Sequence, residues 1–207
     1  MTQADRDNLR ERLGLNDGLM TQYGRFVVNA AQGNFGISYR NGQDVLSLIA
    51  ERFPATLELV FVATLISLLL GLPLGVLTAI KRGKWYTEGL QFLSIVGVSL
   101  PSFVVGILLI LVFSVSLGWF PAFGRGDVVQ LGGWSTGLLT PSGRLAILLP
   151  AIALSLYQVT LVMRLVRAEM LEVLRSDYVK FARARGIPRW RIYFSHALRN
   201  CLMPVVT

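Results

Sequence analysis

Few side chains in this chain have the type and spacing that chemistry requires. Ser195 and His196 are adjacent, but adjacent side chains on a helix do not face each other, so they are not placed as a nucleophile and its base. The single cysteine, Cys201, excludes a disulfide framework and a thiolate zinc site built from this chain alone. A Walker-type phosphate-binding loop is absent, which assigns nucleotide hydrolysis to another chain. We expect no catalytic residue, no metal site and no cofactor.

One acid, Glu58, lies near the start of a long apolar run. Between Leu59 and Ile80 the run holds fourteen Leu, Ile, Val and Phe residues. Each favours membrane insertion by about 0.3 to 0.6 kcal/mol, whereas one acid opposes it by a few kcal/mol. We expect the run to insert, with Glu58 either at the membrane interface or lining a polar path inside a helix bundle.

The elements that must position these residues are membrane helices. The chain of 207 residues is 53% hydrophobic and 15% charged, with a mean hydropathy of +0.56. A helix needs roughly 20 apolar residues to cross a bilayer. Three runs are long enough, at about 55–80, 90–117 and 145–163. The composition therefore predicts an all-α integral membrane protein with three spans.

Lys and Arg in the short loops predict the orientation of the spans. Basic residues follow the first span at Lys81, Arg82 and Lys84 and recur throughout 164–200, whereas the loop between the second and third spans has Arg125 balanced by Asp127. We expect the basic loops to face the cytoplasm. The polar segment 1–54 and the loop after the second span then lie outside.

Each predicted span contains a proline, at Pro73, Pro101 and Pro150. Proline in a bilayer is tolerated where neighbouring helices or water satisfy the freed carbonyls. These residues, with Glu58, are candidates for helix kinks or for the wall of a path through a bundle. The alternative is that proline and glycine are simply common in membrane helices.

A basic stretch, Ser176 to Asn200, follows the third span. Ser176 or Asp177 is a suitable N-cap, Gly186 is a suitable left-handed helix end, and Pro188 is well placed to begin a second helix. The pattern predicts a short helix, a glycine turn and another helix, shaped to dock a partner. Enforcing topology and holding anionic lipid would explain the charge but not the turn residues. Membrane tethering argues against DNA.

This stretch, "DYVKFARARGIPRWRIYFSHALRNCLMPVVT", resembles the EAA-type cytoplasmic loop of ABC-importer permeases, in the version of the dipeptide and oligopeptide permease family. Similar resemblances cover "GNFGISYRNGQDVLSLIAERFPATLEL", "SLPSFVVGILLILVFSVSLGWFPAFG" and "LLPAIALSLYQVTLVMRLVRAEMLEVL". The resemblance implies a kinked helix bundle of the ABC importer type. It also implies a coupling helix before the glycine that sits in a groove of an ATPase. The implied docking residues are Asp177, Tyr178, Lys180, Phe181, Ala182, Arg183, Ala184 and Gly186.

Two departures from the family pattern stand out. Lys180 and Phe181 occupy positions where the motif has Glu and Ala, which affects the exact contacts of the docking helix. Members usually have six spans, whereas this chain shows the middle three. Two further features suggest missing spans at both ends. The expected outer N-terminus has no preceding export segment, and the apolar end "CLMPVVT" looks like the start of another helix. We expect the chain to be the interior of a longer protein.

The resemblance implies a permease subunit of an importer in the prokaryotic plasma (inner) membrane, crossing it several times, that couples ATPase closure to alternating access and is not itself an enzyme. Its implied partners are a second permease subunit, two cytoplasmic ATPase subunits, an extracytoplasmic substrate-binding protein and the lipid bilayer, with no nucleic acid. We divide the chain into an outer segment, 1–54, and a transmembrane domain, 55–207, whose coupling loop covers about 164–200. The alternative is a small membrane scaffold whose basic loop recruits lipid or a soluble partner.

Overall fold

The computed structural model describes residues 17–38 and 42–201, and the chain divides into two units, Met1–Pro54 and Ala55–Thr207. In the first unit, helix α2 (Leu19–Ala31) is followed by an isolated bridge between Ile37 and Asp44. Asp44 caps the next helix, because its Oδ2 accepts a hydrogen bond from the backbone N–H of Ser47 at 3.0 Å.

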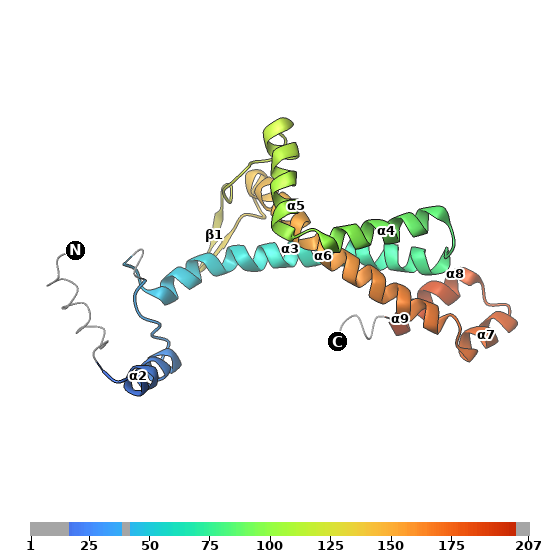
Figure 1. Cartoon of the computed structure of the whole chain (residues 1–207), viewed down its shortest axis with the longest axis horizontal. Coiled ribbons are helices and arrows are strands. Elements are labelled where there is room, and N and C mark those ends of the chain that lie inside the picture. The colour runs from blue at the N-terminus through green and yellow to red at the C-terminus, as the bar shows by residue number, and fades with distance from the viewer. Residues whose placement is uncertain (1–16, 39–41, 202–207) are drawn as a thin grey trace. The chain divides into compact units, whose positions relative to one another are not determined.

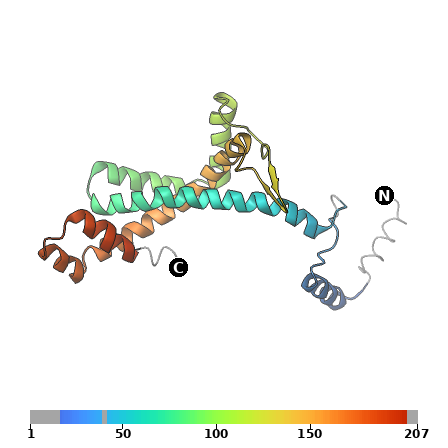
Figure 2. The same ribbon diagram turned by 180° about the vertical axis from the view of Figure 1, so that it is seen from behind.

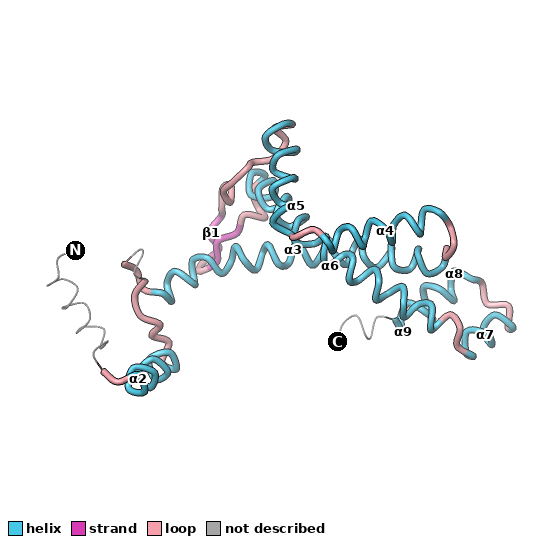
Figure 3. Tube along the Cα trace, viewed as in Figure 1, coloured by secondary structure: helices cyan, strands magenta, loops and turns pink. Residues whose placement is uncertain are grey.

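The second unit is built from long helices (Figures 1 and 2). Helix α3 (Val45–Ile80) enters it from the first unit, and a short turn leads to α4 (Trp85–Ser99), α5 (Ser102–Leu109) and the π-helical η1 (Ile110–Ser116). A hairpin of β1 (Val129–Leu131) and β2 (Trp134–Thr136) precedes α6 (Pro141–Val173). Four short elements follow: α7 (Asp177–Ala184), α8 (Arg189–Arg191), η2 (Ile192–Ala197) and α9 (Leu198–Cys201). The predicted all-α membrane fold is confirmed, with one small hairpin added (Figure 3).

Two helices, α3 and α6, are long and apolar enough to cross a membrane. Each is longer than its predicted span, and each continues through its proline, Pro73 or Pro150. The predicted span at 90–117 is instead a pair of helices bent by 102° between Ser99 and Ser102, and counts as a third span only if the pair is taken as one. Proline at position 101 has no N–H, so the carbonyl of Gly97 loses its helical donor and the helix ends there.

Close packing of α3 on α6 depends on two glycines one helical turn apart. A Cβ added at Gly71 would lie 2.8 Å from Val162 Cγ1, and one at Gly75 would lie 2.7 Å from Val166 Cβ. Small residues four apart allow membrane helices to approach closely. These two glycines therefore form the contact of α3 with α6.

Helix α6 begins at the hairpin and ends in the basic loop, so it links the two ends of this unit. Thr140 is its N-cap, because Thr140 Oγ1 accepts from the N–H of Gly143 at 3.1 Å, and Pro141 follows at the first helical position. At the other end α6 packs with α3 and α9 around a buried cluster of Val76, Ala79, Val166, Met170, Ala197 and Cys201.

Candidate functional site

The basic stretch folds as predicted into a short helix, a tight turn and a second helical segment. Ser176 occupies the N-cap position of α7, but its hydroxyl donates to the carbonyl of Val173 at 2.6 Å instead of capping the helix. Arg183 lies in the last turn, where the helix dipole favours a cation. The second segment runs without a break through α8, η2 and α9.

Gly186 ends α7 in a left-handed conformation with φ +76°. Its N–H donates to the carbonyl of Arg183 at 3.0 Å, and the N–H of Ile187 donates to the carbonyl of Ala182 at 3.2 Å. These two bonds, with Ile187 packed against Ala182, form a Schellman motif. The glycine therefore fixes the direction in which the chain leaves the helix.

One face of α7 is buried and the other is open. Val179 and Ala182 pack with Ile192 and with the end of α6 at Val173 and Leu174. The expected docking residue Ala182 therefore contributes to the buried face, at 8% exposure. The opposite face presents two aromatic rings, Tyr178 at 43% and Phe181 at 64% exposure, together with Asp177, Lys180, Arg183, Ala184 and Gly186.

Several side chains on this open face contact one another or the neighbouring helix α9. Lys180 Nζ lies 2.8 Å from Asp177 Oδ1, and the guanidinium of Arg185 lies 5.6 Å from the centre of the Phe181 ring. Asn200 Nδ2 donates to Tyr178 Oη at 2.9 Å, which ties α7 to α9. Nearby, Trp190 and Phe194 are also more than half exposed. An apolar and basic surface of this kind is suited to a protein partner.

At the other end of the unit, Glu58 is buried at 6% exposure. Its carboxylate accepts hydrogen bonds from Arg125 Nη2 at 3.3 Å, Trp134 Nε1 at 3.4 Å and the N–H of Gly137 at 3.3 Å. Glu58 thus joins the first half of α3 to the loop that carries the hairpin. All three partners belong to the loop before α6, and the placement of Glu58 at the membrane interface or along a polar path stays a prediction.

The stretch "GWSTG" around Ser135 matches the G-x-S-x-G pattern of serine hydrolases, whose serine lies on a strand-to-helix turn. Here Ser135 lies on β2 of the hairpin, and its Oγ accepts from Arg125 Nη1 at 2.8 Å. The same guanidinium contacts Glu58. The serine therefore belongs to the structural junction at Glu58.

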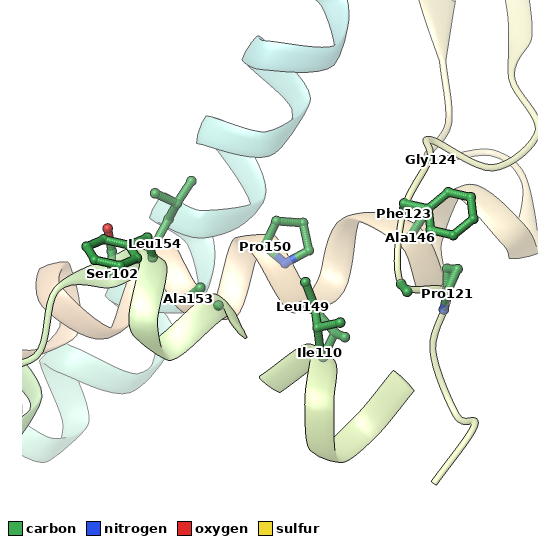
Figure 4. Close-up of a pocket in the computed structure, with 13 residues that line it drawn as sticks. Ser102, Ile110, Pro121, Phe123, Gly124, Ala146, Leu149, Pro150, Ala153 and Leu154 are labelled. Atoms are coloured by element: carbon green, nitrogen blue, oxygen red, sulfur yellow. The ribbon is translucent and has the colours of Figure 1, made fainter. Parts of the chain in front are cut away.

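The four residues expected at kinks or along a path line four cavities, one of which Glu58 and Pro150 share. Pro150 lines an apolar cavity of about 400 Å³ between α5, α6 and the loop at Pro121 to Gly124 (Figure 4). With Glu58 it also lines a smaller one of about 150 Å³. Pro101 lines a cavity of about 370 Å³ at the bend, and Pro73 lines one of about 320 Å³ near Phe194. A path that involves these residues remains a prediction.

Comparison with known proteins connects these features. The family model described as the inner membrane component of binding-protein-dependent transport systems matches residues 71–207, which include the α3–α6 contact and the whole basic loop. The chain belongs to this family.

Members of the family with similar sequences include peptide permeases. The chain is 42% identical to the di/tripeptide transport system permease protein DppB of Pseudomonas aeruginosa, over 95% of this chain and 62% of that protein. It is 39% identical to the oligopeptide transport system permease protein AppB of Bacillus subtilis, over 100% of this chain and 64% of that protein. It is 37% identical to the probable D,D-dipeptide transport system permease protein DdpB of Escherichia coli, over 97% of this chain and 63% of that protein. The chain thus spans less than two thirds of the length of these relatives, which are named as permeases and not as enzymes.

Proposed function

We propose that the chain acts as a transmembrane permease subunit of an ATP-binding cassette importer for peptides or similar small solutes. The names of the similar permeases, which specify peptides, support the peptide substrate class. In this proposal the protein crosses the prokaryotic inner membrane several times. It works with a second permease subunit, two cytoplasmic ATPase subunits and an extracytoplasmic substrate-binding protein.

The observation that carries the proposal is the attachment of α7. Its buried face packs on the end of α6, and the segment that follows the Gly186 turn packs on both α3 and α6. A force applied to the open face of α7 is therefore transmitted to both long helices through buried contacts. This is the arrangement needed to convert closure of a cytoplasmic ATPase into movement of the spans.

We assign the ATPase contacts to the open face of α7. Tyr178 and Phe181 are large enough to enter a groove of the partner, and their exposed area would be buried there. Asp177, Lys180, Arg183, Ala184 and Gly186 border them. Ala182 acts indirectly in this proposal, because it holds α7 against Ile192 and Ile187.

Replacing Gly186 with Val tests the coupling role. A β-branched residue is strongly disfavoured at φ +76°, so the turn should change and α7 should lose its direction. We expect co-purification of the ATPase subunits with the assembled permease to fall at least tenfold. Gly186→Asn, which tolerates this conformation better, should retain most of the binding.

Gly83→Val is the matched control. Gly83 has φ +81° and open space around its Cβ position, like Gly186, but it lies in the other basic loop. It should reduce ATPase binding much less than Gly186→Val does. Unchanged ATPase binding by Gly186→Val, with the protein present in the membrane at normal amounts, would show that α7 is not the docking helix. A scaffold that only recruits lipid would give that result.

A further inference from the structure

A cavity between α4 and α6, whose mostly apolar wall includes two arginines, has no part in the proposed coupling. Its volume is about 340 Å³, and it lies toward the end of the unit that carries the basic loops, because its α6 residues belong to the second half of that helix. Its wall contains Gln91, Ser94 and Ile95 from α4, and Met163, Arg164, Arg167, Ala168 and Leu171 from α6. Two arginines in the wall of a groove between membrane helices require an explanation.

The register of the two helices places these groups opposite each other. A Cβ added at Gly97 would lie 3.7 Å from Thr160 Oγ1, which aligns these two positions. The helices run in opposite directions, so one turn back along α4 reaches Ser94 and one turn forward along α6 reaches Arg164. A second turn reaches Gln91 and Arg167. The polar groups therefore form one continuous patch across the groove.

The arginines have no partner in the part of the chain that the structure describes. Arg167 Nε is buried there without a hydrogen bond, and no carboxylate lies within 4 Å of either guanidinium in residues 17–38 and 42–201. The neighbouring acid Glu88 instead accepts from Gln91 Nε2 at 3.4 Å. A buried guanidinium N–H without an acceptor is costly, so the groove is suited to an anion.

The surroundings of the patch indicate which anion it would bind. Arg164 and Arg167 follow Leu145 by about 20 residues, or roughly 30 Å of helix, which is the thickness of the hydrocarbon core. Exposed apolar side chains lie beside the patch or next to it on both helices: Phe92 at 65%, Ile95 at 58% and Leu161 at 57% exposure. Basic residues Lys81, Arg82 and Lys84 precede α4. An anion with a long apolar tail would match all three features.

We propose that the groove between α4 and α6 binds the phosphate of an anionic phospholipid. The planar guanidinium groups of Arg164 and Arg167 hold the phosphate oxygens, and Ser94 and Gln91 form the polar wall on the other side. The acyl chains lie along Ile95, Phe92 and Leu161. This inference concerns the lipid environment of the chain and does not depend on which solute is transported.

Native mass spectrometry of the full chain in detergent tests the site. Palmitoyl-oleoyl phosphatidylglycerol and the matching phosphatidylcholine are added separately, and the retained lipid is counted. Wild type should retain the anionic lipid in preference to the zwitterionic one. Because each arginine near an anionic surface contributes about 1 kcal/mol, or about fivefold, the pair Arg164→Gln and Arg167→Gln should lower this preference by about 30-fold.

Two further variants separate the site from general charge and from misfolding. Arg175→Gln with Arg189→Gln removes the same charge from exposed positions outside the groove and should change the preference less than threefold. Arg164→Lys with Arg167→Lys keeps the charge and should retain at least a third of the preference. A preference that survives the Gln pair, or that falls equally in the exposed pair, overturns the proposal.

A competition arm distinguishes a lipid from a soluble phosphate. Inorganic phosphate is added in large excess at constant ionic strength. We expect the bound phosphatidylglycerol to remain, because its acyl chains contribute most of its binding energy. Displacement of the lipid by inorganic phosphate would overturn the lipid assignment and identify the groove as a site for soluble phosphate.

Discussion

Glu58 is the residue whose loss should most disturb the hairpin end of the transmembrane unit. Arg125, Trp134 and the N–H of Gly137 all donate hydrogen bonds to the Glu58 carboxylate. Glu58→Gln removes the negative charge of this acceptor and leaves the positive charge of Arg125 in place. Losing a hydrogen bond to a charged group costs about 1.5 to 3 kcal/mol, although the partly exposed Arg125 lowers the effect. We expect the loop between Gly118 and Thr140 to be cut by protease at least several-fold faster in membrane vesicles.

Asp127→Asn is the control for this prediction. Asp127 lies in the same loop and accepts a hydrogen bond from Ser142 Oγ at 2.7 Å, but it is exposed. The substitution makes the same change of charge and should leave the rate of cleavage within about twofold. Equal rates for Glu58→Gln and wild type would mean that the Glu58 junction does not hold the loop.

Cys201 offers a pH-dependent prediction. Burial, with a smaller effect from the charge of Glu169, raises the pKa of its thiol from the ordinary 9.0 to about 11. The folded state therefore holds the proton more tightly than the unfolded state. The contribution of the Cys201 thiol to the free energy of unfolding is constant below about pH 9 and falls as the pH rises from 9 toward 11.

Maleimide labelling measures this directly, because Cys201 is the single cysteine. We expect slow labelling of the folded chain at pH 8 and rapid labelling after denaturation, since both burial and the raised pKa keep the thiolate scarce. Ser195→Cys in a Cys201→Ser background, at a nearby exposed position, should react quickly. Fast reaction of Cys201 at pH 8 would contradict its buried position against α3 and α6.

Sequence reasoning succeeded at Gly186 and was incomplete at Glu58, for a physical reason. The turn depends on a few adjacent residues, and the glycine, the following proline and the preceding basic turn all favour the same helix end. The partners of Glu58 lie 67 to 79 residues farther along the chain. Nothing near Glu58 in the sequence specifies them, so only its two possible environments could be named.

At the scale of the elements, the contact between α3 and α6 should depend on the size of residue 75. A side chain at Gly75 would meet Val166 Cβ at 2.7 Å and the carbonyl of Met163 at 2.9 Å. Overpacking of this kind costs about 1 to 3 kcal/mol. We expect Gly75→Val to lower the midpoint of thermal unfolding in detergent by several degrees.

Gly97→Ala provides the comparison. Gly97 is also inside a membrane helix, but the atom nearest to an added Cβ is Thr160 Oγ1 at 3.7 Å, an ordinary contact. This variant should unfold at or above the wild-type temperature, because alanine favours the helix. If Gly75→Val were as stable as Gly97→Ala, the α3–α6 contact would be looser than described.

The long helices themselves were predictable from uninterrupted apolar composition. The 102° bend between α4 and α5 was not, because Pro101 specifies a break but leaves its angle to the helices packed around it. The role of Gly71 and Gly75 in the close packing of α3 on α6 could not be predicted from the sequence either. Glycine in a span is compatible with a kink or with close packing, and the choice depends on the facing residues of α6.

At the scale of the molecule, the predicted orientation follows from the basic loops and can be tested with one reporter at each end. Phe123 is 91% exposed in the loop beside the hairpin, and Phe181 is 64% exposed on α7. In a Cys201→Ser background, Phe123→Cys should react with a membrane-impermeant thiol reagent in intact cells. Phe181→Cys should react only after the membrane is opened. The reverse pattern would invert the topology and remove α7 from the cytoplasm.

The junction at Glu58 also has a consequence for biosynthesis. When Glu58 is added to the growing chain, Gly137 is still 79 residues from being made. At a synthesis rate of about 5 to 20 residues per second, roughly 4 to 16 seconds pass before the last partner of this carboxylate is made. During that interval the loop with the hairpin is incomplete and does not fix the depth of α3. Arrival of the loop then anchors the helix, so the position of the first long helix is decided by a segment synthesised after it.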